Sequence, residues 1–249
     1  MTAIPSHALD TSLASGNLAA MVDAVVENAR VSGGYELLVQ GERRLAGATL
    51  ADQIERTAHG FSRRGMGPGD VILFGVRPGI DALVLRPSWV VSESLLYAAS
   101  ARTPLSIYLR RAGLELPRLA TVPGQHVRAG RRVLGLVPRS LALHKLVRES
   151  AGEPASLPAH IQPHAPSMVV FTSGTTGKPK GVQHTGRSIT AAVRMLLGGF
   201  ELPTDAVVYT HNLLTLVVGA RKGLRCVVAP LAVTPAQFLR AVEAPRVPH

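Results

Sequence analysis

The chain has 249 residues, of which 46% are apolar, 17% are charged and only 4% are aromatic. This composition indicates a globular rather than a disordered chain, with a core built mostly from alanine, valine and leucine. The formal net charge of +11 comes from 23 arginines and four lysines scattered without interleaved aromatic residues, which favours solvated surface charge over a dedicated nucleic-acid site.

The first third of the chain alternates between predicted helices and short strands. Residues 1–17 are small and polar, which predicts a disordered N-terminus. Asn17 and Thr49 each precede apolar residues at helical spacing, as helix N-caps do. The predicted elements are a helix over residues 18–30, a strand over 35–40, a turn at 41–43, a helix from residue 49 to about 64, a glycine-rich break at 65–70, and an apolar strand over 71–76 of the kind found inside parallel sheets.

The rest of the chain continues this alternation with less regular spacing. The predicted elements are helices over residues 80–85, 93–100, 107–112, 188–197 and 235–242, strands over 89–91, 119–122 and 168–171, a connector over most of 137–166, and apolar segments at 207–210, 213–218 and 226–229, the second of which reads as strand or helix. Strands that alternate with helices predict an α/β fold with mixed, largely parallel sheets and flanking helices.

The sequence also argues against disulfides, a cysteine metal site, a secretory signal and a membrane span. Cys226 is the single cysteine, so the chain has no disulfide framework and no CxxC metal site, and a reducing, cytoplasmic setting is expected. The N-terminus lacks the basic and apolar regions of a secretory signal. The most apolar stretch, residues 206–233, is interrupted by basic side chains, and we expect no membrane span.

One segment, residues 171–182, is distinguished by its chemistry. An apolar strand leads into ten residues that are nearly all glycine, serine, threonine or lysine. Glycines allow backbone N–H groups to turn toward an anion, hydroxyls donate to phosphate oxygens without adding charge, and lysines supply positive charge. The residues are Thr172, Ser173, Gly174, Thr175, Thr176, Gly177, Lys178, Lys180 and Gly181. This pattern predicts a phosphate-binding loop.

Two other interpretations fit this segment less well. A plain flexible loop does not need two lysines flanking Pro179 directly after a buried strand. The nucleotide-triphosphatase loop, GxxxxGK[ST], does not match, because Lys178 is followed by proline and no glycine lies five residues before Gly177. A helix is expected to follow, and Pro179 would keep the loop from folding into it.

The run FTSGTTGKPKGV, with His184 two residues later, resembles the signature of the AMP-binding, adenylate-forming enzymes, which include acyl-CoA synthetases and fatty acyl-AMP ligases. The resemblance extends more weakly over residues 50–74 and 209–242. It implies an incomplete N-terminal domain of the adenylate-forming ligase fold, with a partial adenylation domain over residues 18–249 and no small C-terminal domain.

The resemblance also implies a reaction. A carboxylate attacks the α-phosphorus of ATP bound with Mg²⁺, which gives an acyl-adenylate and pyrophosphate, and a thiol, usually coenzyme A, then accepts the acyl group. By match to the signature, Thr172, Ser173, Thr175, Thr176 and Lys180, with Gly174, Gly177 and Lys178 between them, would hold the ATP phosphates. His211 would lie beside the acyl pocket, although a lone histidine between apolar segments is more often structural.

The sequence departs from this family in several places. It lacks the Tyr-Gly-x-Thr-Glu stretch that contacts the α-phosphate and magnesium, the Thr-Gly-Asp motif that grips the ribose, and the lysine that drives adenylation. A further gap is expected near residues 85–86. We therefore expect this chain alone to have little or no ligase activity. A carboxylic acid would be its substrate only if a partner chain supplied the missing motifs. The alternatives are a non-catalytic module that binds a nucleotide, polyphosphate or protein partner, and a nucleic-acid binder supported by charge alone.

Overall fold

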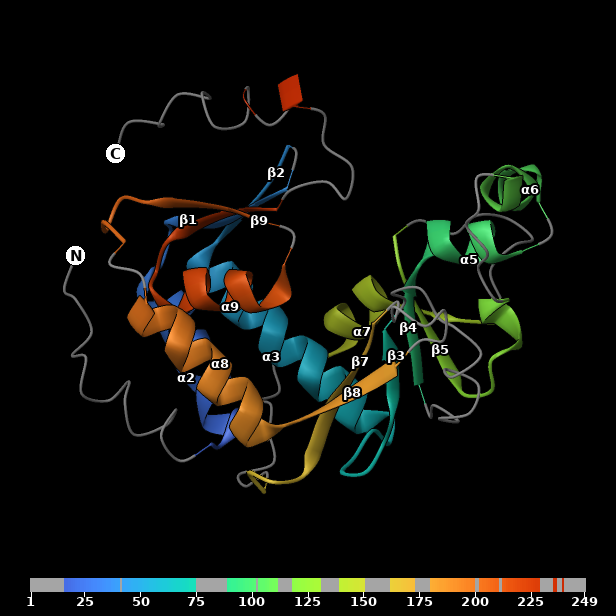
Figure 1. Cartoon of the computed structure of the whole chain (residues 1–249), viewed down its shortest axis with the longest axis horizontal. Helices are drawn as coiled ribbons and strands as arrows, with labels where there is room; N and C mark the ends of the chain where they lie inside the picture. Colours follow the sequence, from blue (N-terminus) through green and yellow to red (C-terminus); the bar gives the residue numbers. More distant parts are fainter. Residues whose placement is uncertain are drawn as a thin grey trace. The chain divides into compact units, whose positions relative to one another are not determined.

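A computed structural model gives the arrangement of the chain (Figure 1). It describes residues 16–40, 42–74, 89–101, 103–111, 118–130, 139–150, 162–172, 180–199, 202–210 and 212–228, together with Pro235, Ala236 and Leu239. The chain divides into two compact units, of which the first comprises residues 1–54 and 157–249 and the second comprises residues 55–156. Among the described helices, none has the length and apolar character to cross a bilayer.

The first unit contains a mixed sheet with strand order β2-β1-β10-β9. The strands are β1 (Glu36–Gln40), β2 (Arg43–Ala46), β9 (Val207–Thr210) and β10 (Arg225–Val228). Strands β1, β10 and β9 run parallel, and β2 returns antiparallel beside β1. Helix α9 (Leu213–Arg221) packs on β9 and β10, and helices α2 (Leu18–Val31) and α8 (Gly186–Gly199) pack on α9 (Figure 1).

The ends of helix α2 follow the sequence prediction. The Asn17 side chain accepts hydrogen bonds from the backbone N–H groups of Ala19 and Ala20, as an N-cap does. After the helix, Gly33 adopts a positive φ of 52°, which lets the chain turn into β1. The buried face of α2 contributes to two apolar clusters. One is formed by Met21, Ile189, Val193 and Val218, and the other by Val26, Ala29, Leu37 and Ala51.

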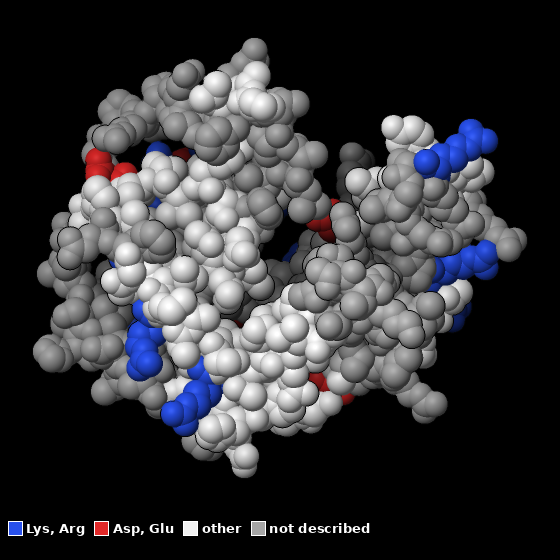
Figure 2. Space-filling model, viewed as in Figure 1, with Lys and Arg blue, Asp and Glu red and all other residues white. Residues whose placement is uncertain are grey.

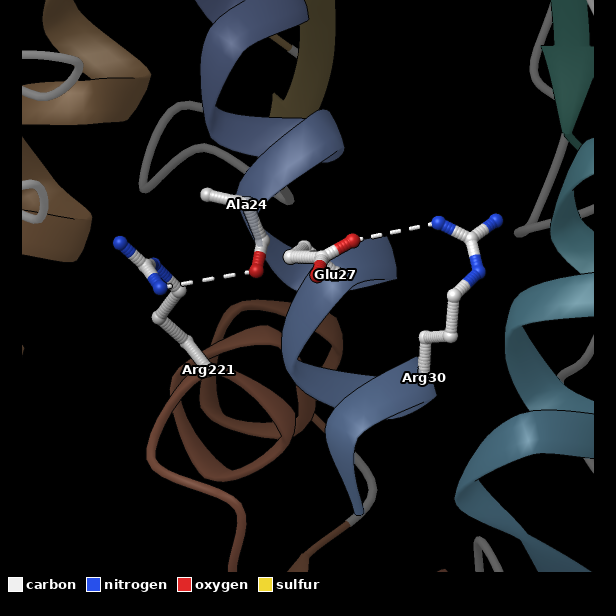
Figure 3. A network of polar contacts seen from close by, with 4 residues as sticks. All are labelled: Ala24, Glu27, Arg30 and Arg221. Atoms are coloured by element: carbon white, nitrogen blue, oxygen red, sulfur yellow. Dashed lines mark hydrogen bonds and ion pairs between the residues drawn. The ribbon is translucent and has the colours of Figure 1, made fainter. Parts of the chain in front are cut away.

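A buried arginine joins α9 to α2 (Figure 3). Arg221, at the end of α9, is only 5% exposed, and its Nη1 donates to the Ala24 carbonyl over 3.5 Å. The Asn28 amide nitrogen donates to the backbone oxygen of Arg221. Burial lowers the pKa of the Arg221 guanidinium. Glu27 instead pairs with Arg30 at the surface over 3.2 Å, so the buried guanidinium has no carboxylate partner among the described residues.

The second unit contains a parallel sheet with strand order β3-β4-β5-β6. Its strands are β3 (Ile72–Phe74), β4 (Trp89–Glu93), β5 (Gln125–Ala129) and β6 (Leu141–Ala142), and its helical segments are α5 (Ser94–Ser100), α6 (Pro104–Arg111), the 3₁₀ turn η1 (Leu119–Thr121) and α7 (Leu143–Glu149). Helix α3 (Gly47–Arg63) runs across the boundary between the units. Phe61 of α3 packs edge-on against the buried Trp89, with ring centroids 5.5 Å apart.

The predicted mixed, largely parallel α/β architecture is confirmed, but several local predictions were wrong. Residues 119–121 form a 3₁₀ turn rather than a strand, and β5 was not predicted. Strand β6 and helix α7 lie inside the predicted connector. Strand β3 is at an edge of the described sheet, and Thr49 lies inside α3, which begins at Gly47. The predicted helix over 80–85 and all but three residues of the helix over 235–242 lie outside the described residues.

Candidate functional site

The predicted phosphate loop connects two antiparallel strands. Strands β7 (Pro166–Thr172) and β8 (Lys180–Thr185) pair with Phe171 opposite Gly181 and Thr172 opposite Lys180. Residues 173–179 therefore join two backbone positions that face each other across the last pair of the ladder. A connection of this length is longer than the roughly 2–5 residues that close most hairpins. The hairpin thus brings together the two ends of the glycine-, hydroxyl- and lysine-rich segment.

The helix predicted over residues 188–197 is confirmed by the helix at Gly186–Gly199, but a strand that was not predicted separates it from the loop. Residues 180–185 form β8, because they pair with β7 over the whole strand and satisfy their backbone groups there. The helix begins afterwards at Gly186. Thr185 and Ser188 cap it reciprocally: Ser188 N–H donates to Thr185 Oγ1 over 3.2 Å, and Thr185 N–H donates to Ser188 Oγ over 2.9 Å. This cap fixes the direction in which β8 enters α8.

The hairpin is anchored to the first unit at its base. Met168 of β7 packs against the cluster that contains Ile189 and Val193 of α8. The Arg187 N–H donates to the Pro163 carbonyl over 2.8 Å, which ties the start of α8 to the chain before β7. Farther along the hairpin, apolar side chains remain exposed, namely Val169, Val170 and Val182. The base of the hairpin is therefore packed against α8.

The predicted site residues differ in how far the structure describes them. Thr172 and Lys180 have described backbones within the ladder, whereas Ser173, Gly174, Thr175, Thr176, Gly177 and Lys178 lie outside the described residues. Their assignment to the ATP phosphates stays a prediction.

His211 also lies outside the described residues, but its neighbours are placed. It falls between β9 and α9, at the carboxyl end of a parallel strand, where open α/β sheets bind ligands. The Asn212 N–H donates to Thr210 Oγ1 over 3.0 Å, and the Asn212 side chain accepts from the N–H groups of Leu214 and Thr215. These bonds fix the residues on either side of His211.

The buried titratable groups of the described chain are unsuited to proton transfer or nucleophilic attack. Burial raises the pKa of the Cys226 thiol to about 11 and that of Tyr97 to about 12. The Tyr97 hydroxyl lies 2.8 Å from His126 Nδ1, and His126 Nε2 lies 2.9 Å from the Val122 carbonyl. Because a carbonyl can only accept, Nε2 carries the proton and Tyr97 donates to Nδ1. This pair stabilises the second unit.

The same described residues contain no group of three or more histidine, cysteine, aspartate or glutamate side chains able to hold a metal ion.

Comparison with known families decides the assignment. The family described as AMP-binding enzyme matches residues 116–249, which is more than half of the chain and includes the whole hairpin. The chain belongs to the AMP-binding enzyme family. The fold agrees, since the structure of an anthranilate CoA ligase in complex with anthranoyl-AMP superimposes with a TM-score of 0.62 at 16% identity over 88% of this chain. The resemblance inferred from the loop signature is thereby confirmed.

Similar sequences carry ligase names. The chain is 54% identical over 48 residues to malonate–CoA ligase of Arabidopsis thaliana, which covers 19% of this chain and 8% of that protein. It is 26% identical over 197 residues to acetyl-coenzyme A synthetase of Burkholderia lata, which covers 65% of this chain and 29% of that protein. The chain spans 46% of the anthranilate CoA ligase structure, so it corresponds to under half of the length of each of these relatives.

Proposed function

We propose that this chain binds the β- and γ-phosphates of ATP at the loop between β7 and β8, as the phosphate-binding part of a ligase that activates a carboxylic acid by adenylation. The observation that carries this proposal is the hairpin itself. It pairs Thr172 with Lys180 and joins them through seven residues whose types suit an anion, inside the segment that matches the AMP-binding family.

The side chains of the loop suit the binding of phosphate rather than proton transfer. Lys178 and Lys180 would offset the charge of the polyphosphate, and the hydroxyls of Thr172, Ser173, Thr175 and Thr176 would donate hydrogen bonds to its oxygens. Backbone N–H groups near Gly174 and Gly177 would add further donors. These groups hold the leaving pyrophosphate while the carboxylate attacks the α-phosphorus, so their contribution is positioning and charge stabilisation. Mg²⁺ would enter as the ATP complex.

The identity of the acid is a finer part of the proposal. The resemblance to acyl-CoA synthetases and fatty acyl-AMP ligases makes a fatty acid the first proposed substrate, with coenzyme A as the thiol acceptor, and the single cysteine fits a reducing, cytoplasmic compartment. The names of the relatives mention malonate, acetyl-coenzyme A and anthranilate, so short and aromatic acids belong in the same assay panel.

We further propose that the 249-residue polypeptide by itself binds nucleotide without efficient turnover. The motifs expected to contact the ribose, the α-phosphate and magnesium are not in this sequence, although the phosphate loop is. Loss of such electrostatic groups commonly costs about 10²–10³ in rate for a single donor. This is the second candidate function, a polyphosphate-binding module, and the presence of the loop without those motifs favours it.

Calorimetry and isotope exchange test the two parts separately. We expect ATP and pyrophosphate to bind and AMP to bind more weakly, because the loop would contact the terminal phosphates. The double variant Lys178→Ala, Lys180→Ala should lose most of this binding, whereas Lys145→Ala, which removes an exposed lysine on α7, should not. ATP–pyrophosphate exchange with the acid panel should be close to background. Equal affinity for AMP and ATP would refute phosphate binding by the loop, and exchange at a rate normal for a synthetase would refute the second part.

A further inference from the structure

Helix α6 in the second unit presents its apolar face to solvent. Ile107 and Tyr108 are 56% and 69% exposed, and Leu105 and Pro104 are also exposed. At 100° per residue these four positions and Arg111 fall within one arc of about 160° around the helix. The partly buried positions, Ser106 and Leu109, fall on the opposite side. An amphipathic helix in a soluble domain normally has the reverse orientation, with its apolar stripe on the core.

Local hydrogen bonds hold α6 in this orientation. Thr103 and Ser106 cap the helix reciprocally, with the Thr103 N–H donating to Ser106 Oγ over 3.1 Å and the Ser106 N–H donating to Thr103 Oγ1 over 3.2 Å. The Thr103 hydroxyl also donates to the Ala98 carbonyl of α5 over 3.1 Å. The cap therefore fixes the polar Ser106 side toward α5 and leaves the apolar arc outward.

The sequence on both sides of α6 is strongly basic. Residues 55–156, which form the second unit, contain 15 lysines and arginines against seven acidic residues, and residues 101–148 contain ten against one. Arg111 at the end of α6 and Arg118 just before η1 are exposed, and neither forms an ion pair within the described chain. Figure 2 shows blue side chains and no red at the upper right, where Figure 1 places α6.

We propose that α6, together with the exposed Arg111 and Arg118, binds the surface of an anionic phospholipid membrane peripherally. Exposed leucine, isoleucine and tyrosine are the side chains that enter the headgroup boundary, and arginines beside them attract anionic lipid. A nucleic acid would use the arginines but gain little from exposed aliphatic side chains, and a second copy of this chain would bring the same positive charge against itself. A helix of two turns inserts little apolar surface, so binding should be weak and reversible. This surface is independent of the phosphate loop.

Flotation of the full chain with vesicles tests the proposal. We expect binding to vesicles of phosphatidylcholine mixed with phosphatidylglycerol, little binding to phosphatidylcholine alone, and loss of binding as NaCl rises from roughly 0.1 M to 1 M, where the Debye length falls from about 10 Å to about 3 Å. The double variant Ile107→Ser, Tyr108→Ser should reduce vesicle affinity about tenfold or more. Met195→Ser is the matched control, because this methionine is exposed on α8 of the other unit.

Charge-reversal variants test the electrostatic contribution to membrane binding. Arg111→Glu with Arg118→Glu should weaken binding to the anionic vesicles by at least about fivefold per position, while Arg194→Glu on α8 should have a much smaller effect. Circular dichroism of every variant should match that of the parent, because all of these side chains are exposed. Vesicle binding that survives Ile107→Ser, Tyr108→Ser would overturn the proposal. So would a variant effect confined to oligomeric state, or to the affinity for a short DNA duplex.

Discussion

Gly60 allows helices α3 and α7 of the second unit to pack closely. A Cβ atom at this position would lie 2.3 Å from Leu146 Cδ2, 2.6 Å from Leu146 Cγ and 2.8 Å from Ser150 Oγ. Leu146 is fully buried and Ser150 is 2% exposed, so neither side chain can move outward freely. We predict that Gly60→Ala destabilises the protein, although alanine is intrinsically the better helix former.

The magnitude follows from two opposing effects. Overpacking a core costs about 1–3 kcal/mol. The higher helix propensity of alanine offsets about 1 kcal/mol of this. The net loss should therefore be about 0–2 kcal/mol, and nearer the upper end because three atoms are contacted at once. Gly198→Ala is the matched control, because a Cβ on this α8 residue would meet no described atom within 4 Å. That variant should be neutral or slightly stabilised.

A double-mutant cycle distinguishes this contact from a general helix effect. Leu146→Ala alone should cost about 2–5 kcal/mol, because it opens a cavity at a fully buried position. In the Gly60→Ala background the same substitution should cost about 1–3 kcal/mol less, since the new methyl group occupies part of the space. Urea unfolding followed by circular dichroism measures all four proteins. Additivity within about 0.5 kcal/mol would refute the argument from close packing.

Three further predictions concern the first unit, and urea unfolding measures each. Asn28→Ala should cost about 1–3 kcal/mol, because it removes the buried hydrogen bond to the backbone carbonyl of Arg221. Arg221→Met should cost less, because it keeps this backbone acceptor and removes a desolvated guanidinium whose Nε has no described partner. Burial raises the pKa of Cys226 to about 11 in the folded state, against an ordinary 9.0. The thiol's contribution to the free energy of unfolding is therefore complete below pH 9 and is lost as the pH rises toward 11, because the unfolded chain ionises first. The free energy of unfolding should fall by roughly 2–3 kcal/mol less over this pH range in Cys226→Val than in the parent. Thr185→Ala should cost about 1 kcal/mol, because it removes the N-cap of α8.

The sequence predicted best the elements that carry strong local signals. Asn17 precedes an apolar stripe at helical spacing, and α2 forms there with this cap. The apolar segment at 213–218 was compatible with a strand or a helix. It forms helix α9, and the Asn212 side chain caps the start of that helix. Asparagine at that position was the signal that could have decided the question.

The errors arise where tertiary pairing overrides local preference. Strand β5, which contains polar residues such as Gln125 and Arg128, is a strand because β4 and β6 pair with it on both sides. Strand β8 carries glycine, lysine and glutamine and is stabilised by its pairing with β7. Neither partner can be identified from the strand's own residues. Similarly, glycine at position 60 reads as a weak point in a helix, and only the position of Leu146 shows why it is there.

The loop signature had the opposite character, because it is local, specific and independent of the surrounding fold. It predicted the AMP-binding family from about a dozen residues, and the family match over residues 116–249 agrees. The hairpin adds what the signature does not contain, namely that the two ends of the loop are held opposite each other by strand pairing.

The most direct test of nucleotide binding is the amide spectrum of the isotopically labelled chain during titration with Mg-ATP at millimolar concentration. Phosphate capture by the connection between β7 and β8 predicts that the amide resonances of residues 172–181 shift together and saturate, and that the Lys178→Ala, Lys180→Ala protein shows no such change. If those resonances stay in place while the rest of the spectrum shows the protein folded, the assignment of this loop to ATP is wrong.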